Sequence, residues 1–336
     1  MEEQPSRKQT VCHTRHPIRS YMERIERIDL HLPKGWNAMT VEELEVVAKT
    51  IMDCVKTDGA EYMKRAKIEL FLQLAGLEVV ESACPEKPVE EQYIVVKKNE
   101  RMGTFILYLW QMHYWIEELM GWMDERPKVL RFPYQVHRVW RYGVLPMRYE
   151  GPGALMQDFS WTQYRIAGEY LNYYVSESNR LNELIARGNA SELDLRKQTR
   201  ATARAKALFL ATLYRRKVKV VDEETRLVER KYAYVSSQST RNLRDFLSFP
   251  DVKFQVVLFW WTGMMGYLQK KFPRVFKEDD PKQNRTVNPL EVYTRTTATM
   301  EKYLGIHEKE LGRETYTNVL QHLNDMMEEN EKLNKK

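Results

Sequence analysis

The sequence is poor in the residues that build turn-dense or disulfide-bonded folds. Its 336 residues include 14 Gly, 13 Pro and three widely separated cysteines, Cys12, Cys54 and Cys84. So few Gly and Pro residues argue against a β-sandwich or barrel, because those folds need many tight turns. An odd, sparse cysteine count is typical of reduced thiols in the cytosol, and it does not indicate a disulfide framework.

The chain also lacks a long apolar run. The longest, Val256–Leu268, has 13 residues, whereas a membrane-spanning helix needs about 20. We therefore expect this run to form a buried core helix and expect no membrane partner. The first 20 residues, MEEQPSRKQTVCHTRHPIRS, are polar, so we predict no signal peptide.

Motifs for catalysis are missing as well. The sequence has no phosphate-binding loop, no dinucleotide fingerprint and no Gly-x-Ser-x-Gly elbow. Cys12, His13 and His16 offer too few ligands for a structural zinc site. His307 begins a zinc-peptidase pattern, but Leu311 stands where the second His is needed. We predict a non-enzymatic protein with no catalytic residues, no metal ligands and no cofactor.

The segment GPGAL contains two glycines, so it can be interpreted as a phosphate-binding loop or as a simple turn. It begins at Gly151, and Pro152 removes a backbone amide that a phosphate cradle would use. We therefore expect a loop turn and no phosphate site.

The fold class follows from what the chain does contain. Apolar residues recur at helical spacing in most segments, and short β-prone runs lie between them. The pattern predicts a mainly α, multi-lobed helical protein with minor β-strands and a hairpin. We expect four parts, which are a flexible N-terminal tail (1–24), a helical unit with minor strands (25–125), a central helical unit with a β-hairpin (126–280), and a linker with a C-terminal helical tail (281–336).

Helix boundaries are indicated by capping residues. Thr40 with Glu43, and Ser160 with Gln163, have the spacing of capping boxes in which each side chain bonds the other residue's backbone amide. Gly188 is expected to end a short helix.

Five further segments complete the prediction of secondary structure. We expect a long aromatic helix over 102–123, an irregular segment over 127–157, two separate helices over 161–178 and 179–188, and a hairpin over 217–235.

Basic residues are concentrated in one window. From Arg196 to Lys219 there are nine Lys or Arg residues and no acid, giving +9 against +6 for the whole chain, so the remainder is slightly acidic. At about 100° per residue, the first four fall within an arc of about 100° on a helix. The candidate site for a polyanion or an acidic partner comprises Arg196, Lys197, Arg200, Arg204, Arg215, Arg216, Lys217 and Lys219.

This basic window has less specific interpretations too. Arg215–Lys217 could be the charges that complement the dipole at a helix C-terminus. The stripe could also be a solvated helix face. Because the rest of the chain is not basic, we favour a protein partner over nucleic acid. The alternative function is nucleic-acid binding through the Arg196–Lys219 stripe.

A second candidate surface interleaves aromatic and basic residues. The segment RFPYQVHRVWRYGVLPMRY contains Arg138, Trp140, Arg141 and Tyr142. Alternating stacking platforms and cations suit single-stranded nucleic acid. The same aromatics could instead fix a proline-rich loop to the core.

Several segments resemble one group of phage proteins. They are LPKGWNAMTVEEL, RAKIELFLQLAGLEV, DFSWTQYRIAGEYLNYY, LFLATLYRRK and WWTGMMGYLQKKFPRVF, which occur in this order over most of residues 30–336. In this respect the chain is similar to tail-region, virion-morphogenesis proteins of tailed phages and prophages of Bacteroidetes. These segments are packing motifs, so the resemblance supplies no catalytic residues.

The resemblance implies a role in phage tail or virion assembly, for example as a tail-assembly chaperone. The expected partners are other phage structural or tail proteins, with nucleic acid or a second copy of the chain as further alternatives. The expected location is the host bacterial cytoplasm during assembly, or the virion.

Overall fold

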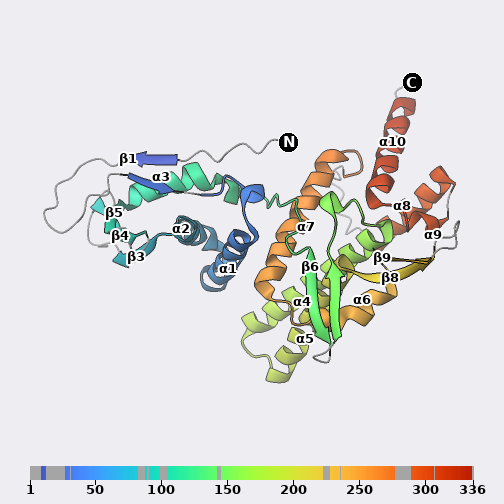
Figure 1. Ribbon diagram of the computed structural model, residues 1–336, viewed down its shortest axis with the longest axis horizontal. Helices are drawn as coiled ribbons and strands as arrows, with labels where there is room; N and C mark the ends of the chain where they lie inside the picture. The colour runs from blue at the N-terminus through green and yellow to red at the C-terminus, as the bar shows by residue number, and fades with distance from the viewer. Residues whose placement is uncertain are drawn as a thin grey trace. The chain divides into compact units, whose positions relative to one another are not determined.

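A computed structural model gives the fold, which is mainly helical with minor β-structure, as predicted (Figure 1). The chain divides into two compact units, Met1–Val129 and Leu130–Lys336, close to the expected boundary after residue 125. The residues described are 9–12, 27–30, 32–81, 88, 91–98, 104–141, 145–221, 228–234, 236–276, 289–305 and 307–334.

The first unit contains three α-helices among its described residues. They are α1 (Val41–Asp58), α2 (Tyr62–Leu74) and α3 (Leu109–Met120). The capping box before α1 is confirmed, because the Glu43 amide donates to Thr40 Oγ1 at 3.2 Å and the Thr40 amide donates to Glu43 Oε2 at 2.7 Å. Gly76, with φ +66°, follows the end of α2.

The first unit also contains a three-stranded antiparallel sheet. Its strands lie in the order β3 (Glu78–Glu81), β4 (Tyr93–Lys97), β5 (Thr104–Tyr108). Strand β5 shows that the predicted helix over 102–123 is wrong in its first third. Phe105 and Leu107 are buried and alternate with half-buried neighbours, because this stretch pairs with β4 along its whole length.

Little of the expected N-terminal tail is described. Of residues 1–24, the structure describes Gln9–Cys12, which form β1 and pair with β2 (Arg27–Leu30). His13 and His16 lie outside the described residues.

The second unit contains a four-stranded antiparallel sheet of two hairpins. Its strands lie in the order β6 (Val136–Arg141), β7 (Leu145–Glu150), β8 (Arg215–Val221), β9 (Val228–Ala233). The predicted β8–β9 hairpin is confirmed. The hairpins join through only two register pairs, Tyr149 with Arg216 and Glu150 with Arg215. In Figure 1 the β8–β9 hairpin runs across the direction of β6.

The β6–β7 hairpin corrects the prediction that residues 127–157 are irregular. The prolines of this segment had indicated a loop, but Pro146 lies in β7 opposite Trp140. The pairing with β8 does not extend to Pro146, so Pro146 lies where one edge of β7 is unpaired, a position at which a strand tolerates proline.

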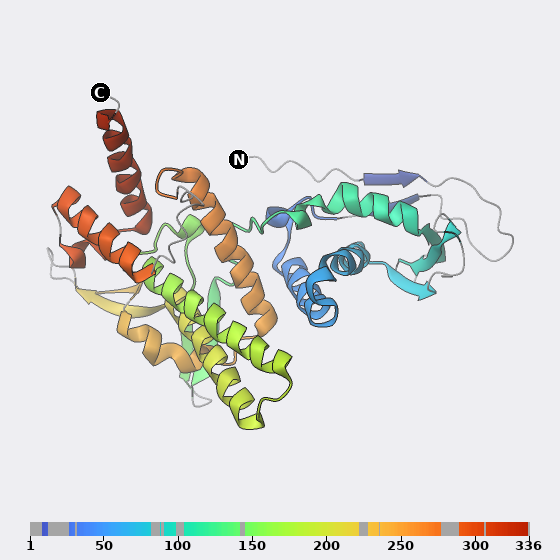
Figure 2. The ribbon, with the colours of Figure 1, turned by 180° about the vertical axis from the view of Figure 1, so that it is seen from behind.

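Helices α4 (Trp161–Arg187) and α5 (Glu192–Leu213) run side by side, as Figure 2 shows from behind. The two short helices expected over 161–188 are therefore one continuous helix, and Gly188 ends it in the left-handed conformation at φ +66°. Ser160 caps α4 by accepting from the Gln163 amide at 3.1 Å. The expected box is incomplete, however, because the Gln163 side chain donates to the Thr212 carbonyl at 2.7 Å instead.

Aromatic side chains form the core of the second unit. Helix α6 (Ser236–Asn242) and a 3-10 turn (Leu243–Phe246) precede α7 (Asp251–Lys271). Trp260 of α7 is fully buried and meets Phe132 edge-on at 4.7 Å. Most of Val256–Leu268 is buried, which confirms the predicted core helix. Within the described residues, no helix has the length and apolar character required to cross a bilayer.

The C-terminal helices belong to the second unit. They are α8 (Pro289–Leu304), α9 (Glu308–Leu311) and α10 (Tyr316–Asn334), and most of the expected linker lies outside the described residues. Tyr316 is buried and stacks on Tyr164 of α4 with ring centroids 5.1 Å apart. The Trp161 amide donates to the Glu314 carbonyl at 2.8 Å, so the start of α4 is bonded to the turn before α10.

Candidate binding surfaces

The structure divides the basic window into three parts with different surroundings. The first part lies on the N-terminal half of α5, where Arg196, Lys197, Arg200 and Arg204 are all exposed. Ser191 begins the helix by accepting from the Asp194 amide at 3.1 Å. The predicted helical stripe of four cations is therefore present and accessible.

The stripe also includes an apolar side chain that the sequence analysis missed. Leu193 lies one turn before Arg196 and Lys197, inside the same arc of the helix, and it is 61% exposed. A search for apolar residues at i−3 and i−4 from the cations would have identified it. We call Leu193, Arg196, Lys197, Arg200 and Arg204 the α5 stripe.

The cations of the α5 stripe differ in their partners. Arg196 forms an ion pair with Glu192 one turn earlier, at 2.6 Å. Within the described part of the chain, Lys197, Arg200 and Arg204 have no acidic partner within ion-pair distance. Three exposed positive charges are thus available for a partner molecule.

The opposite side of α5 is fixed against α4. Gln198 donates to the Glu177 carboxylate at 2.7 Å and to its carbonyl at 2.9 Å. Thr202 donates to the same carbonyl at 3.2 Å, and Glu177 is only 6% exposed. These bonds set the rotation of α5, so the α5 stripe faces away from α4.

The second part of the basic window is buried. Lys206 lies in the C-terminal half of α5, where Ala205 to Leu213 are all buried. Its ammonium group donates to the Phe249 carbonyl at 2.8 Å and pairs with Asp251 at 2.6 Å. Lys206 therefore joins α5 to the start of α7 and contributes nothing to an outer surface.

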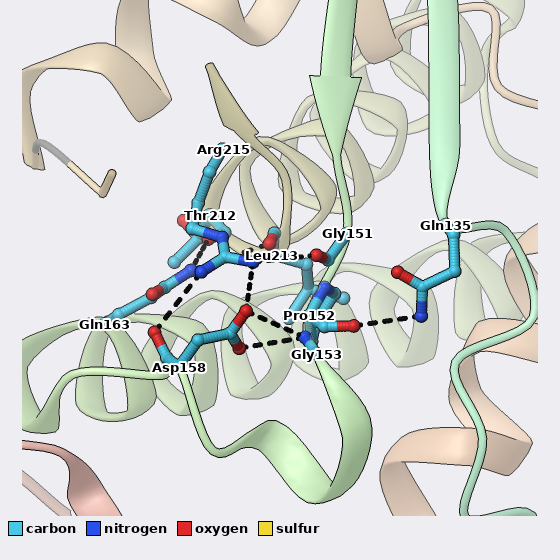
Figure 3. A network of polar contacts seen from close by, with 9 residues as sticks. All are labelled: Gln135, Gly151, Pro152, Gly153, Asp158, Gln163, Thr212, Leu213 and Arg215. Atoms are coloured by element: carbon cyan, nitrogen blue, oxygen red, sulfur yellow. Dashed lines mark hydrogen bonds and ion pairs between the residues drawn. The ribbon is translucent and has the colours of Figure 1, made fainter. Parts of the chain in front are cut away.

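Arg215, a predicted site residue, is also buried, and this corrects the prediction. It is the first residue of β8, because α5 ends at Leu213 and has no basic residue in its last turn. The guanidinium donates to the Gly151 carbonyl at 2.9 Å and pairs with the Asp158 carboxylate (Figure 3). Arg215 therefore closes a loop of the fold, and the helix-dipole interpretation of Arg215–Lys217 is wrong.

In the loop around Gly151, an internal carboxylate binds the backbone amide and the nearby arginine. The Asp158 carboxylate accepts from the Gly153 amide at 2.8 and 3.0 Å, and Figure 3 shows it between this amide and Arg215. It thus occupies the position that an anion would take. A Cβ atom at Gly153 would lie 2.8 Å from Asp158 Oδ2, so a larger residue there would displace this carboxylate. The predicted loop turn is confirmed.

The third part of the basic window lies on the four-stranded sheet. Lys217 and Lys219 of β8 are exposed, whereas Arg216 between them is half-buried. On β6, Arg138 is exposed and Trp140 is 66% exposed. The side chain of Arg141 and all of Tyr142, which were predicted to belong to this surface, lie outside the described residues.

The inner side of the same sheet carries a buried polar cluster. Tyr149 is fully buried and donates to the Asp245 carboxylate. His137 stacks on Phe246 with ring centroids 4.9 Å apart, and its Nε2 donates to the Asp245 carbonyl at 3.3 Å. Burial lowers the pKa of His137, which favours the neutral ring. This cluster fixes the sheet on the turn before α7.

No other described feature assembles a reactive site. In the first unit, a cavity of about 470 Å³ is lined by Lys34, Gly35, Trp36, Asn37, Ala38, Trp122, Glu125 and Lys128. Its wall includes Trp36 and Trp122, which meet edge-on at 5.0 Å, and it presents no histidine or cysteine. Among the described residues, no three His, Cys, Asp or Glu side chains are grouped as metal ligands.

Comparison with protein-family models, with curated proteins and with solved structures finds no match for this chain.

Proposed function

We propose that this chain is a non-enzymatic protein of phage tail or virion assembly, which acts by binding another protein through the α5 stripe. The observation that carries the proposal is the exposed row of Lys197, Arg200 and Arg204 on one helix face, with Leu193 in the same arc. The sequence resemblance to tail-region phage proteins supports the biological setting.

The composition of the α5 stripe favours a protein as the partner. Leu193 would be left in water if the stripe met only phosphates, whereas a protein surface can cover it. Arginine and lysine side chains around an apolar residue are typical of an interface with an acidic, partly apolar partner. The expected partner is a phage structural or tail protein with such a surface, and the role is that of an assembly factor or tail-assembly chaperone.

The proposal is tested by particle formation in a host whose phage lacks this gene. Complementation with Lys197→Gln, Arg200→Gln and Arg204→Gln combined should reduce particle yield at least tenfold. The matched control combines Arg180→Gln, Arg187→Gln and Lys270→Gln, which removes three exposed charges elsewhere in the same unit. The control should restore particles, and both proteins should accumulate to equal levels.

Two outcomes would contradict the proposal. Normal particle yield with the α5 variant would show that the stripe is not the binding surface. Normal yield without any copy of the gene would show that the chain has no role in assembly.

A further inference from the structure

The outer face of the four-stranded sheet joins two sets of residues that lie far apart in the sequence. On β6 and β7 the positions of Arg138, Trp140, Pro146 and Arg148 are exposed, while the intervening positions are half-buried or buried. The register sets Arg138 opposite Arg148 and Trp140 opposite Pro146. Because side chains opposite each other share a face, these four form one surface.

The second hairpin continues this face. Glu150 lies opposite Arg215, whose side chain is buried against Gly151 and Asp158, and the next alternate positions of β8 on that side are Lys217 and Lys219. Both lysines are exposed. We call Arg138, Trp140, Arg148, Lys217 and Lys219 the outer sheet face.

The charges of the outer sheet face are nearly all of one sign. It carries four cations, and among the described side chains of these strands the acid on this side is Glu150, 3.6 Å from Arg148. Like charges directly opposite each other destabilise a sheet, and Arg138 lies opposite Arg148. An anionic ligand would relieve this repulsion.

The exposed ring of Trp140 indicates which kind of anion the outer sheet face binds. Its indole is 66% exposed beside these cations, and no described residue stacks on it. A nucleobase can stack on such a ring while the adjacent phosphates meet Arg and Lys side chains. In a duplex the bases stack on one another, so the indole would gain nothing there.

We infer that the outer sheet face binds single-stranded nucleic acid, with Trp140 as a stacking platform and Arg138, Arg148, Lys217 and Lys219 as phosphate contacts. This site is separate from the α5 stripe, so the result of its test does not depend on whether the proposed function is correct. The recognition is independent of sequence, because stacking and phosphate contacts read no base edges.

The test is fluorescence anisotropy of the full chain with labelled 12-nucleotide oligo(dT) and oligo(U). With four phosphate contacts, the slope of log affinity against log salt should be about −3, which is about a 50-fold loss of affinity between 50 and 200 mM salt. Arg138→Gln with Lys219→Gln should halve the slope. DNA and RNA strands together show which sugar the site prefers.

Variants of Trp140 distinguish base stacking from purely electrostatic binding. Trp140→Ala should weaken oligonucleotide binding about tenfold, and Trp140→Phe should restore most of it. The matched control is Trp110→Ala, since Trp110 is 51% exposed on α3 of the other unit and should not affect binding. Circular dichroism establishes that each variant is folded.

Three results would overturn the inference. One is equal affinity for a 12-base-pair duplex and for the single strands, with no effect of Trp140→Ala. A second is loss of binding only when the α5 stripe is changed. The third is tighter binding of an acidic peptide such as a 12-residue polyglutamate, which would assign the face to a protein partner.

Discussion

The buried and the exposed cations of the basic window have the same charge but opposite roles. Lys206 and Arg215 are each less than 10% exposed, and both bind backbone carbonyls and a carboxylate. Lys197, Arg200 and Arg204 lie within 20 residues of them, are exposed, and meet no described acid. A run of positive charge in a sequence therefore combines residues that hold the fold with residues that are free to bind.

Among the buried and exposed cations, Arg215 should cause the largest loss of stability when it is replaced. Replacement by Met leaves the Asp158 carboxylate and the Gly151 carbonyl without their partner in a partly buried loop. We expect a loss of about 3 kcal/mol in the free energy of unfolding, measured by denaturant titration. The double variant Arg215→Met with Asp158→Asn should lose less than the single variant. A loss below about 1 kcal/mol for Arg215→Met would show that the buried pair does not hold the loop.

Lys206 should show the next largest effect. Lys206→Met keeps the aliphatic packing but removes the donor to the Phe249 carbonyl. Because Asp251 is 72% exposed and can be hydrated, we expect a smaller loss, of about 1 to 2 kcal/mol, in the same titration. Stability equal to that of the unchanged protein would place Lys206 among the dispensable surface charges.

A substitution at Gly188 tests the turn that connects α4 to α5. Gly188 has φ +66°, which L-residues adopt at a cost, so Gly188→Ala should destabilise the protein by about 1 kcal/mol. Gly168, which lies inside α4 with open space where a Cβ atom would be added, is the matched control. Gly168→Ala should be neutral or stabilising, and equal losses at both sites would contradict the role of the left-handed turn.

The burial of His137 on the inner face of the sheet predicts that the stability of the protein depends on pH. The folded pKa of His137 is lowered by burial and by nearby Lys253, although Asp245 opposes this shift. Since folding favours the neutral ring, its contribution to stability is present above the ordinary pKa of about 6.5 and is lost as pH falls through the lowered folded value. Melting temperatures from pH 8 to pH 5 should therefore fall more for the unchanged protein than for His137→Gln.

The exposed cations should have the smallest effect on stability. Lys197→Gln, Arg200→Gln and Arg204→Gln should each change the free energy of unfolding by less than about 0.5 kcal/mol, because they break no ion pair with a described residue. Denaturant titration of the three variants measures this. A loss near that of Lys206→Met would mean that the α5 stripe has a structural role.

Features set by neighbouring residues could be predicted from the sequence. The Thr40 capping box, the cap at Ser160 and the β8–β9 hairpin depend on spacings of a few residues, and the structure contains all three. The stripe of Arg196, Lys197, Arg200 and Arg204 follows in the same way from helical geometry.

Features set by distant partners could not be predicted in this way. Strand β5 depends on pairing with β4, and β6 depends on pairing with β7 across a segment rich in proline. The burial of Arg215 depends on Asp158, which is 57 residues away, and the sequence gives no sign of that pair. The outer sheet face was missed as a unit because the join between its two hairpins consists of two register pairs.

The most direct test of the proposed function is a pull-down of the tagged chain from phage-producing cells, with nuclease, at moderate and high salt, read by mass spectrometry. We expect one tail or virion protein to be retained after nuclease and to be lost with Lys197→Gln, Arg200→Gln and Arg204→Gln combined. It should be retained with Arg180→Gln, Arg187→Gln and Lys270→Gln combined. Retention of nucleic acid alone before nuclease, lost as salt rises, would contradict the account and reduce the chain to a polyanion-binding protein.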